Sequence, residues 1–377
     1  MKVKSIPEDF VVIEIDSLQP GAVGGFALYT LRKRAMGTFE AVAAISRELD
    51  CPRNDIGIGG LKDKWAVTEQ ALTIRDGPPR SIQGGRFELV YRGRVPEPLK
   101  KGGFDRNAFR ITLRGLTEGE VTHLQRGLEE VRAHGLPNYF DSQRFGSSRG
   151  SNDFIGRRLV RGEHEAALKL AVATPTHDDP PKLRKIRRQM AEGWGGWEKL
   201  ASELPRRSME HRIADRLARR TGDFAGAFGL IDESLRRLYA SAYQSYLWNQ
   251  TLRGMIKASG VPTVERAYEV GTLLFPRALP PGLKEARIPF PRRGVAPPPA
   301  METAVAAEGL RMEDLKLKGI PGTFFVGGDR EAWVFPMSLV EPEVAPDELN
   351  PGASKAALRF ELPRGSYATL VVKRLFH

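Results

Sequence analysis

An aspartate between two lysines, Asp63, follows a glycine-rich stretch in the segment Gly57–Gln70, GIGGLKDKWAVTEQ. Glycine permits backbone conformations and close approaches that other residues do not. Positive charges such as those of Lys62 and Lys64 favour the ionised form of a carboxyl group, and an ionised carboxylate can act as nucleophile or base. The segment lacks the GxxxxGK[ST] pattern of a phosphate-binding loop. On composition alone, a solvated charged turn explains the segment better than a catalytic site does.

A second segment, Asn138–Gly146 (NYFDSQRFG), interleaves aromatic residues with amide and guanidinium groups and runs into SSRGSN. Aromatic faces stack on bases, and amides and guanidinium groups bond base edges or phosphates. A core strand or turn in which the rings simply pack would have the same composition, so both interpretations stay open. Two shorter segments, Lys4–Phe10 and Leu362–Thr369, each resemble an ordinary entry into a strand.

Several strand and helix patterns surround these segments in the first 150 residues. β-Branched or alternating runs predict strands at Phe10–Ile15, Gly25–Lys33, Arg86–Arg92 and Ala108–Arg114. Helical spacing predicts a helix over Thr38–Leu49. Thr117 and Glu120 form a capping box that predicts the start of another helix. Because strands and helices do not alternate regularly, the pattern favours an α+β sheet over a Rossmann-type one.

The character of the chain changes from about residue 153. Residues 181–220 hold 12 Lys or Arg against 5 Asp or Glu and include the sequence WGGW. Such a basic run is more often a solvated helical face than an RNA contact, and the two tryptophans more often anchor a loop than stack on a base. A long helix is predicted over Asp232–Ala258, and residues 275–300 form a proline-rich loop pattern. The last 25 residues return to strand-like text, which predicts an insertion and a tail that rejoins the first sheet.

The bulk composition sets the class of protein. A length of 377 residues favours two domains, and 41% apolar with 28% charged residues is typical of a folded chain. The single cysteine, Cys51, excludes an intramolecular disulfide and a thiolate metal cluster. We find neither a run of about 20 apolar residues nor a signal-peptide pattern, so we expect a soluble, cytoplasmic protein. The net charge of +12 indicates a polyanionic partner without choosing among RNA, DNA and acidic membranes.

Five segments in this order resemble the TruD family of tRNA pseudouridine synthases. They are PEDFVVIE at 7–14, GGLKDKWAVTEQ, NYFDSQRFG with its trailing GSN, AYQSYLWN and LPRGSYAT. The resemblance implies an enzyme that converts a uridine of tRNA, typically the one at position 13, to pseudouridine without cofactor or metal. It also implies an α+β pseudouridine-synthase catalytic domain with a mainly antiparallel sheet at residues 1–152 and 338–377. A TruD-type insertion domain would interrupt it at residues 153–337.

The resemblance also assigns roles to individual residues. Asp63 matches the catalytic carboxylate and Lys4 the basic residue that pairs with it. Phe140 matches the aromatic residue that stacks on the target base. The other substrate-binding positions correspond to Phe10, Asn138 and Tyr367. In contrast to these matches, Asp141 stands where the family usually has glycine after NYF, which adds a negative charge and leaves the loop shape open.

Two chemical routes and three alternative functions stay open at this point. Asp63, kept ionised by Lys4, would either attack the sugar or remove a proton from it. The alternatives are a tRNA-binding protein or RNA chaperone on the same scaffold, the same activity on another uridine or on messenger RNA, and a DNA-binding protein. The presence of Asp63, Lys4 and Phe140 together favours the enzyme, because binding alone would not require that carboxylate. The sequence does not give the oligomeric state.

Overall fold

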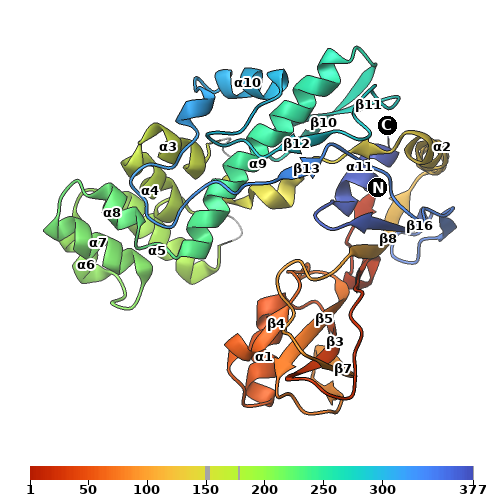
Figure 1. Cartoon of the computed structure of the whole chain (residues 1–377), viewed down its shortest axis with the longest axis horizontal. Coiled ribbons are helices and arrows are strands. Elements are labelled where there is room, and N and C mark those ends of the chain that lie inside the picture. Colours follow the sequence, from red (N-terminus) through yellow and green to blue (C-terminus); the bar gives the residue numbers. More distant parts are fainter. Residues whose placement is uncertain (149–152, 177–178, 377) are drawn as a thin grey trace. The chain divides into compact units, whose positions relative to one another are not determined.

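The computed structural model describes residues 1–148, 153–176 and 179–376. The chain forms two compact units, which are shown in Figure 1: unit 1 combines Met1–Leu136 with Val334–His377, and unit 2 is the segment Pro137–Trp333. The C-terminal segment therefore returns to unit 1, as the sequence predicts. The expected domain limits, 1–152 with 338–377 and 153–337, differ from these unit boundaries and stay a prediction. The GSN triplet at 150–152 lies outside the described residues.

Unit 1 is built on one large sheet. Its strands are β1 (Lys2–Val3), β2 (Phe10–Ile15), β3 (Phe26–Arg34), β4 (Ile56–Ile58), β5 (Val67–Arg75), β6 (Ile82–Gln83), β7 (Phe87–Val95), β8 (Arg106–Leu116), β15 (Glu343–Pro346) and β16 (Ser354–Pro363). The order is β15-β16-β8-β2-β5-β3-β7-β6, with β1 beside β8 and β4 beside β5. The pairing of β2 with β5 is parallel, and the other pairings in this sheet of the described chain are antiparallel. The predicted α+β class with a mainly antiparallel sheet is confirmed.

Two helices of unit 1 begin where the sequence predicts, and a third forms where strand-like text was expected. They are α1 (Thr38–Glu48), α2 (Glu118–His134) and α11 (Ala368–Leu375), with short 3-10 turns η1 (Pro7–Asp9) and η2 (Arg53–Asp55). The predicted capping box at the start of α2 is present, because the Thr117 side chain accepts from the Glu120 N–H while the Glu120 carboxylate accepts from Thr117. Helix α1 turns its apolar face, including Ala41 and Ile45, onto a core shared with β3, β5 and β7.

The strand-like interpretation of the C-terminus is only half right. Residues 354–363 form β16, whereas Ala368–Leu375 form the helix α11. Its apolar side chains are buried, and a Cβ atom at Gly127 of α2 would lie 2.1 Å from the carbonyl oxygen of Leu375. This close packing of α11 on α2 overrides the strand preference of its β-branched residues.

Unit 2 is mainly helical. Its elements are η3 (Ser142–Ser148), α3 (Ile155–Arg161), α4 (His164–Val172), α5 (Pro181–Glu192), α6 (Trp197–Glu203), α7 (Met209–Arg219), α8 (Phe224–Phe228), α9 (Glu233–Ala258), β10 (Thr263–Tyr268), β11 (Gly271–Pro276), β12 (Arg287–Pro289), α10 (Pro299–Ala306), η4 (Met312–Asp314) and β13 (Asp329–Glu331). Two short strands, β9 (Leu136–Pro137) and β14 (Trp333–Val334), lie at the unit boundaries. The predicted long helix is α9, and the buried Trp197 of the WGGW sequence packs in the helical core, as expected of an anchor.

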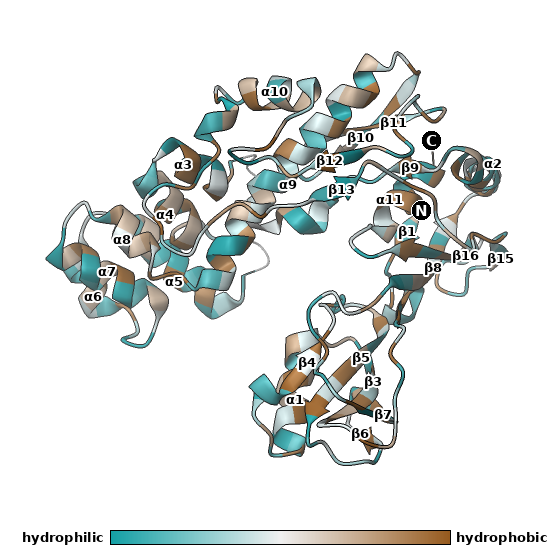
Figure 2. Ribbon diagram, viewed as in Figure 1, coloured by the Kyte–Doolittle hydropathy of each residue, from teal (hydrophilic) through white to brown (hydrophobic). Residues whose placement is uncertain are grey.

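Figure 2 shows hydrophobic residues along strands of unit 1 such as β5, and hydrophobic residues alternating with hydrophilic ones along the helices of unit 2. Among the described residues, no helix combines the length and the apolar character needed to cross a membrane.

Candidate active site

Asp63 lies in the irregular connection between β4 and β5, where the chain passes close to other backbone. A Cβ atom at Gly57 would lie 2.6 Å from the carbonyl oxygen of Leu99, and one at Gly59 would lie 3.0 Å from a carboxylate oxygen of Glu14. The glycines of this segment therefore permit close approach to neighbouring elements, as the sequence indicates. We call residues 59–66 the Asp63 loop.

The residue before Asp63 is anchored through both its backbone and its side chain. The N–H of Lys62 donates to the Thr38 hydroxyl at 3.0 Å. The Lys62 ammonium lies 2.5 Å from Glu14 Oε2, and these side chains are 6% and 0% exposed. The same ammonium donates to Asn107 Oδ1 at 2.9 Å. Lys62 is thus bound to Glu14 of β2, and is not the counter-ion of Asp63 that its position in the sequence indicates.

The lysine that pairs with Asp63 comes from the N-terminal segment. Lys4 Nζ donates to Asp63 Oδ2 at 2.8 Å, with both side chains about one quarter exposed. The backbone of Lys4 has φ of 59°, a left-handed conformation that is uncommon for residues other than glycine. The indole N–H of Trp65 donates to the Lys4 carbonyl at 3.1 Å, so a second contact ties this segment to the Asp63 loop.

The aromatic ring of Phe10 contacts the same lysine. The Lys4 ammonium lies 3.8 Å from the centroid of the Phe10 ring, and that ring is 3% exposed. Every second side chain of a strand points to the same face, so Phe10 and Glu14, which are four residues apart, lie on one face of β2. The Lys4 segment and the Asp63 loop are therefore held at two points along that face. The expected contact of Phe10 with substrate stays a prediction.

The PEDF sequence is fixed by a buried ion cluster. Asp9 accepts from the Arg114 guanidinium at 2.8 Å, and the same guanidinium lies 2.9 Å from Asp347. Burial by itself would raise the pKa of Asp347, but the N–H groups of Gly115 and Leu349 and the guanidinium of Arg114 outweigh it and lower that pKa. The cluster orders the turn that joins Lys4 to Phe10.

A buried lysine, Lys33, also contacts Asp63, and sequence reasoning missed it. Lys33 Nζ donates to the carbonyl oxygen of Asp63 at 2.9 Å and to that of Met36 at 2.7 Å. The residue is 2% exposed. A lysine in the apolar row of a strand was the available signal.

The other residues with an expected substrate contact are Tyr367 in unit 1 and Asn138 and Phe140 in unit 2. Tyr367 is half-buried and immediately precedes α11 in unit 1. In unit 2, Arg330 donates to Asn138 Oδ1 at 2.6 Å, and its guanidinium lies 4.3 Å from the centroid of the Phe140 ring. Phe140 is 7% exposed and packs edge-on against Trp248. The expected substrate contacts of Tyr367, Asn138 and Phe140 stay predictions.

Asp141 does not need the left-handed conformation that a glycine would allow. The residues other than glycine with positive φ among those described do not include it. Its buried side chain accepts from the N–H of Ser142 at 2.8 Å and so shapes the start of η3. The charge therefore has a local structural role.

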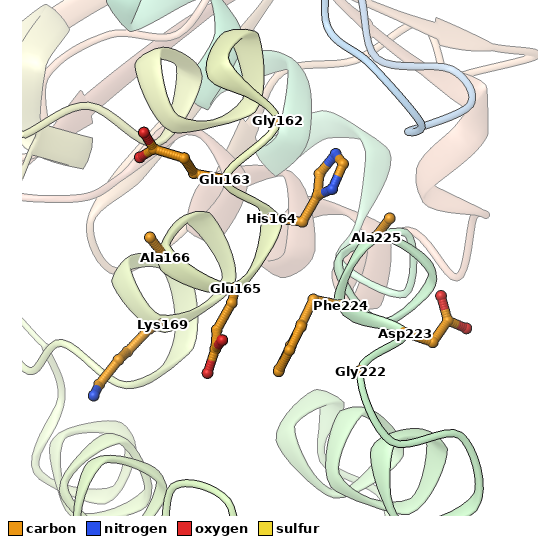
Figure 3. Close-up of a pocket in the computed structure, with 10 residues that line it drawn as sticks. All are labelled: Gly162, Glu163, His164, Glu165, Ala166, Lys169, Gly222, Asp223, Phe224 and Ala225. Atoms are coloured by element: carbon orange, nitrogen blue, oxygen red, sulfur yellow. The ribbon is translucent and has the colours of Figure 1, made fainter.

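A surface hollow of about 690 Å³ lies elsewhere in unit 2, between the starts of α4 and α8. Figure 3 shows Glu163, His164 and Asp223 at its edge, but Glu163 pairs with Arg158 and Asp223 with Arg216. None of the predicted site residues lines it. Within the described chain, no group of three or more His, Cys, Asp or Glu is placed to hold a metal ion.

Comparison with known proteins places the chain in a family. The family model for tRNA pseudouridine synthase D (TruD) matches residues 1–267 and 293–375. A curated relative from Methanocaldococcus jannaschii is 31% identical over 395 residues, covering 100% of this chain and 92% of the relative. The tRNA pseudouridine synthase D of Aquifex aeolicus is 31% identical over 396 residues, and the match covers 100% of this chain and 98% of that relative. A TruD crystal structure from Methanosarcina mazei matches with a TM-score of 0.74 at 28% identity, covering 99% of this chain and 93% of that one. The chain belongs to the TruD family of tRNA pseudouridine synthases.

Proposed function

We propose that this chain converts a uridine of tRNA, the one at position 13, to pseudouridine in the cytoplasm, with Asp63 as the catalytic carboxylate. The observation that carries the assignment is the 2.8 Å ion pair between Asp63 and Lys4 on an anchored loop. The ammonium of Lys4 fixes the direction of the Asp63 carboxylate, while about a quarter of each side chain stays accessible.

The reaction needs only a group that acts at the linkage between ribose and uracil. The N1–C1′ bond breaks, the base rotates, and a C5–C1′ bond forms; C5 loses a proton and N1 gains one. Atoms and electrons balance without an oxidant or a metal. Asp63 acts either as a nucleophile at the sugar or as a base that removes a sugar proton.

The target base must leave the RNA stack to reach Asp63, at a cost of a few kcal/mol. Leu61 and Trp65 flank Asp63 in the loop and are 61% and 51% exposed. An exposed indole can stack on a base, which contributes about 1–3 kcal/mol and offsets part of that cost. Phe140 stays the proposed stacking platform from the resemblance. Because the Arg330 guanidinium lies over its ring, a base that stacks there must displace that group.

RNA binding is supported by the helix α5. Lys182, Lys185 and Arg188 are exposed and recur every third residue, so they follow one another around about a third of the helix circumference. Two other arginines of α5 turn toward the segment before the helix, where Arg187 pairs with Asp179. We call the first three residues the α5 stripe and propose that it contacts RNA phosphates.

The test is replacement of Asp63 by asparagine. Asp63→Asn keeps the shape of the side chain and removes its charge, so we expect a folded protein that binds tRNA but forms no pseudouridine. Asp55→Asn is a matched control, because Asp55 is also paired with a cation in unit 1, at 3.2 Å from Arg75, and its side chain is 29% exposed against 27% for Asp63. The measurement is chemical adduct mapping of pseudouridine in tRNA from a strain that lacks the modification.

Two results would overturn the proposal. Pseudouridine formation by Asp63→Asn at the wild-type rate would remove Asp63 from the chemistry. A wild-type protein that binds tRNA tightly but leaves every uridine unchanged would indicate a binding protein or RNA chaperone. Modification of a uridine other than position 13 would correct the target and leave the chemistry standing.

A further inference from the structure

Lys33 occupies a position where the strand pattern calls for an apolar side chain. Alternate residues of β3 point to one face, and Ala27, Tyr29 and Leu31 on that face belong to the core beneath α1. Lys33 continues the row and is 2% exposed. A buried ammonium loses hydration and is unfavourable unless it has compensating contacts. Its presence in this row therefore needs a reason.

The contacts of Lys33 supply that reason. Its ammonium donates to two backbone carbonyl oxygens, those of Met36 at 2.7 Å and Asp63 at 2.9 Å. Met36 leads into α1, and Asp63 is the middle of the Asp63 loop. Through these two hydrogen bonds the lysine connects the Asp63 loop to the start of a helix that is packed in the core.

We propose that Lys33 is a positioning residue of this enzyme, whose ammonium holds the backbone of Asp63 in its catalytic geometry and whose deprotonation loosens that hold. This inference rests on the proposed role of Asp63. Lys33 does not reach the substrate. It acts through the carbonyl of Asp63, while Lys4 acts on the carboxylate of the same residue.

The surroundings of Lys33 bring the loss of its proton into a pH range that can be tested. Burial lowers the pKa of Lys33 to about 8; the charges of Asp63 and Glu40 oppose this fall, and Lys62 adds to it. Below that pH the ammonium makes charge-assisted bonds, which are stronger than the bonds of a neutral amine. The catalytic rate should therefore be highest below about pH 8 and fall as the pH rises through that value.

The experiment compares single-turnover rates of wild type, Lys33→Met, Lys33→Arg and Arg32→Met on one tRNA across this pH range. Arg32 is the matched control: it is the neighbouring residue of β3, points to the other face and pairs with Glu69 at 3.3 Å. A misplacement of about 1 Å can lower a rate about 100-fold, so we expect Lys33→Met to be about 10- to 100-fold slower with unchanged affinity for tRNA.

The shape of the pH profile separates positioning from a general structural effect. Lys33→Met should show no fall through pH 8, since the titrating group is gone. Lys33→Arg keeps the charge and should retain more activity than Lys33→Met, without the fall. We expect the melting temperature of Lys33→Met to stay within about 3 °C of wild type, because removing a buried charge offsets the loss of two hydrogen bonds.

Three outcomes would overturn the inference. They are a wild-type profile that stays level through pH 8, a Lys33→Met variant as fast as wild type, and a Lys33→Met profile that falls as the wild-type one does. The wild-type pH profile needs no variant, so it tests the inference even if both substitutions of Lys33 unfold the protein. Inactivity of Asp63→Asn together with full activity of Lys33→Met would reject the role of Lys33 and leave the proposed function intact.

Discussion

Replacing Lys62 by methionine is predicted to destabilise unit 1 by an amount that grows with pH. The Lys62 ammonium lies 2.5 Å from Glu14 Oε2, and neither side chain is more than 6% exposed. Lys62→Met keeps most of the side-chain volume but leaves the carboxylate of Glu14 without its cation. Glu14 retains one longer bond, accepted at 3.3 Å from the N–H of Ala71.

The size of the effect follows from the burial of the pair. Removing one partner of a buried ion pair costs about 3–5 kcal/mol, because an uncompensated charge stays behind. Burial already raises the pKa of Glu14, and the charge of Lys62 is the largest influence opposing that rise. Without Lys62 this pKa rises further, so Glu14 takes up a proton as the pH falls. Protonation removes the charge and leaves a loss of about 1–3 kcal/mol from the missing hydrogen bonds.

The sign of the pH dependence follows from proton linkage. A carboxyl group whose pKa is raised on folding binds more protons in the folded state, so stability decreases as the pH rises from the unfolded pKa through the folded one. The further rise in Lys62→Met extends this window upward. The variant should therefore lose more stability relative to wild type at about pH 8.5 than at about pH 5.5.

The assay is urea unfolding at both pH values, with hydrogen exchange of β5 assigning the transition to unit 1. The set comprises wild type, Lys62→Met, Glu14→Gln and the double variant, for which a coupling energy of about 0.5–3 kcal/mol is expected. Lys64→Met is the control, because its 71% exposed side chain is 3.9 Å from Glu40 and should change stability by less than about 1 kcal/mol. An equal loss for Lys62→Met at both pH values, or strictly additive effects, would refute the reasoning.

Three further variants test other parts of the molecule. Arg114→Met should lower the free energy of unfolding of unit 1 by about 3–5 kcal/mol, since two of its three carboxylate partners, Asp9 and Asp347, are buried; the exposed Arg110→Met on the same strand should have little effect in the same urea titration. Replacing the α5 stripe by three glutamines should weaken tRNA binding and reduce the slope of log affinity against log salt by about 2–3, with the single-turnover rate at saturation unchanged. Phe140→Ala should destabilise unit 2 by about 3–5 kcal/mol, measured by hydrogen exchange, and native stability would contradict its packing against Trp248.

Local signals in the sequence predict much of the scaffold. The β-branched run at Phe10–Ile15 is β2 with the same bounds, and the capping box at Thr117 begins α2. These features depend on residues close together in the chain, so periodicity and capping chemistry suffice to find them. The last residues show the limit: the Leu370–Val372 run favours a strand in isolation but forms α11, because the glycine at position 127 lets the helix pack directly on α2.

The partners of the charged residues at the site could not be predicted in the same way. Lys62 and Lys64 are neighbours of Asp63 in sequence, yet they pair with Glu14 and Glu40, and the counter-ion of Asp63 comes from residue 4. Which ammonium faces which carboxylate depends on how the strands pair, and that is a long-range property. Only the ordered set of family segments pointed to Lys4. The local pattern marks Lys33 as a charge in an apolar row of β3, but it does not show that this charge reaches Asp63.

Three residues that depart from ordinary local preferences all contact the Asp63 loop. Lys33 brings a charge into a core row, Glu14 brings one to the buried face of β2, and Lys4 adopts a left-handed backbone with φ of 59°. A buried charge costs several kcal/mol before its contacts are counted, and a left-handed residue about 1–3 kcal/mol. Selection for stability alone would place apolar residues at the first two positions and glycine at the third. The side chains of Lys33 and Lys4 bond to Asp63 itself, and Glu14 holds the residue before it. All three costs therefore serve to fix one carboxylate, from β2, from β3 and from the segment between β1 and η1. Such concentration of unfavourable local choices around one acidic group is the pattern expected of a functional site.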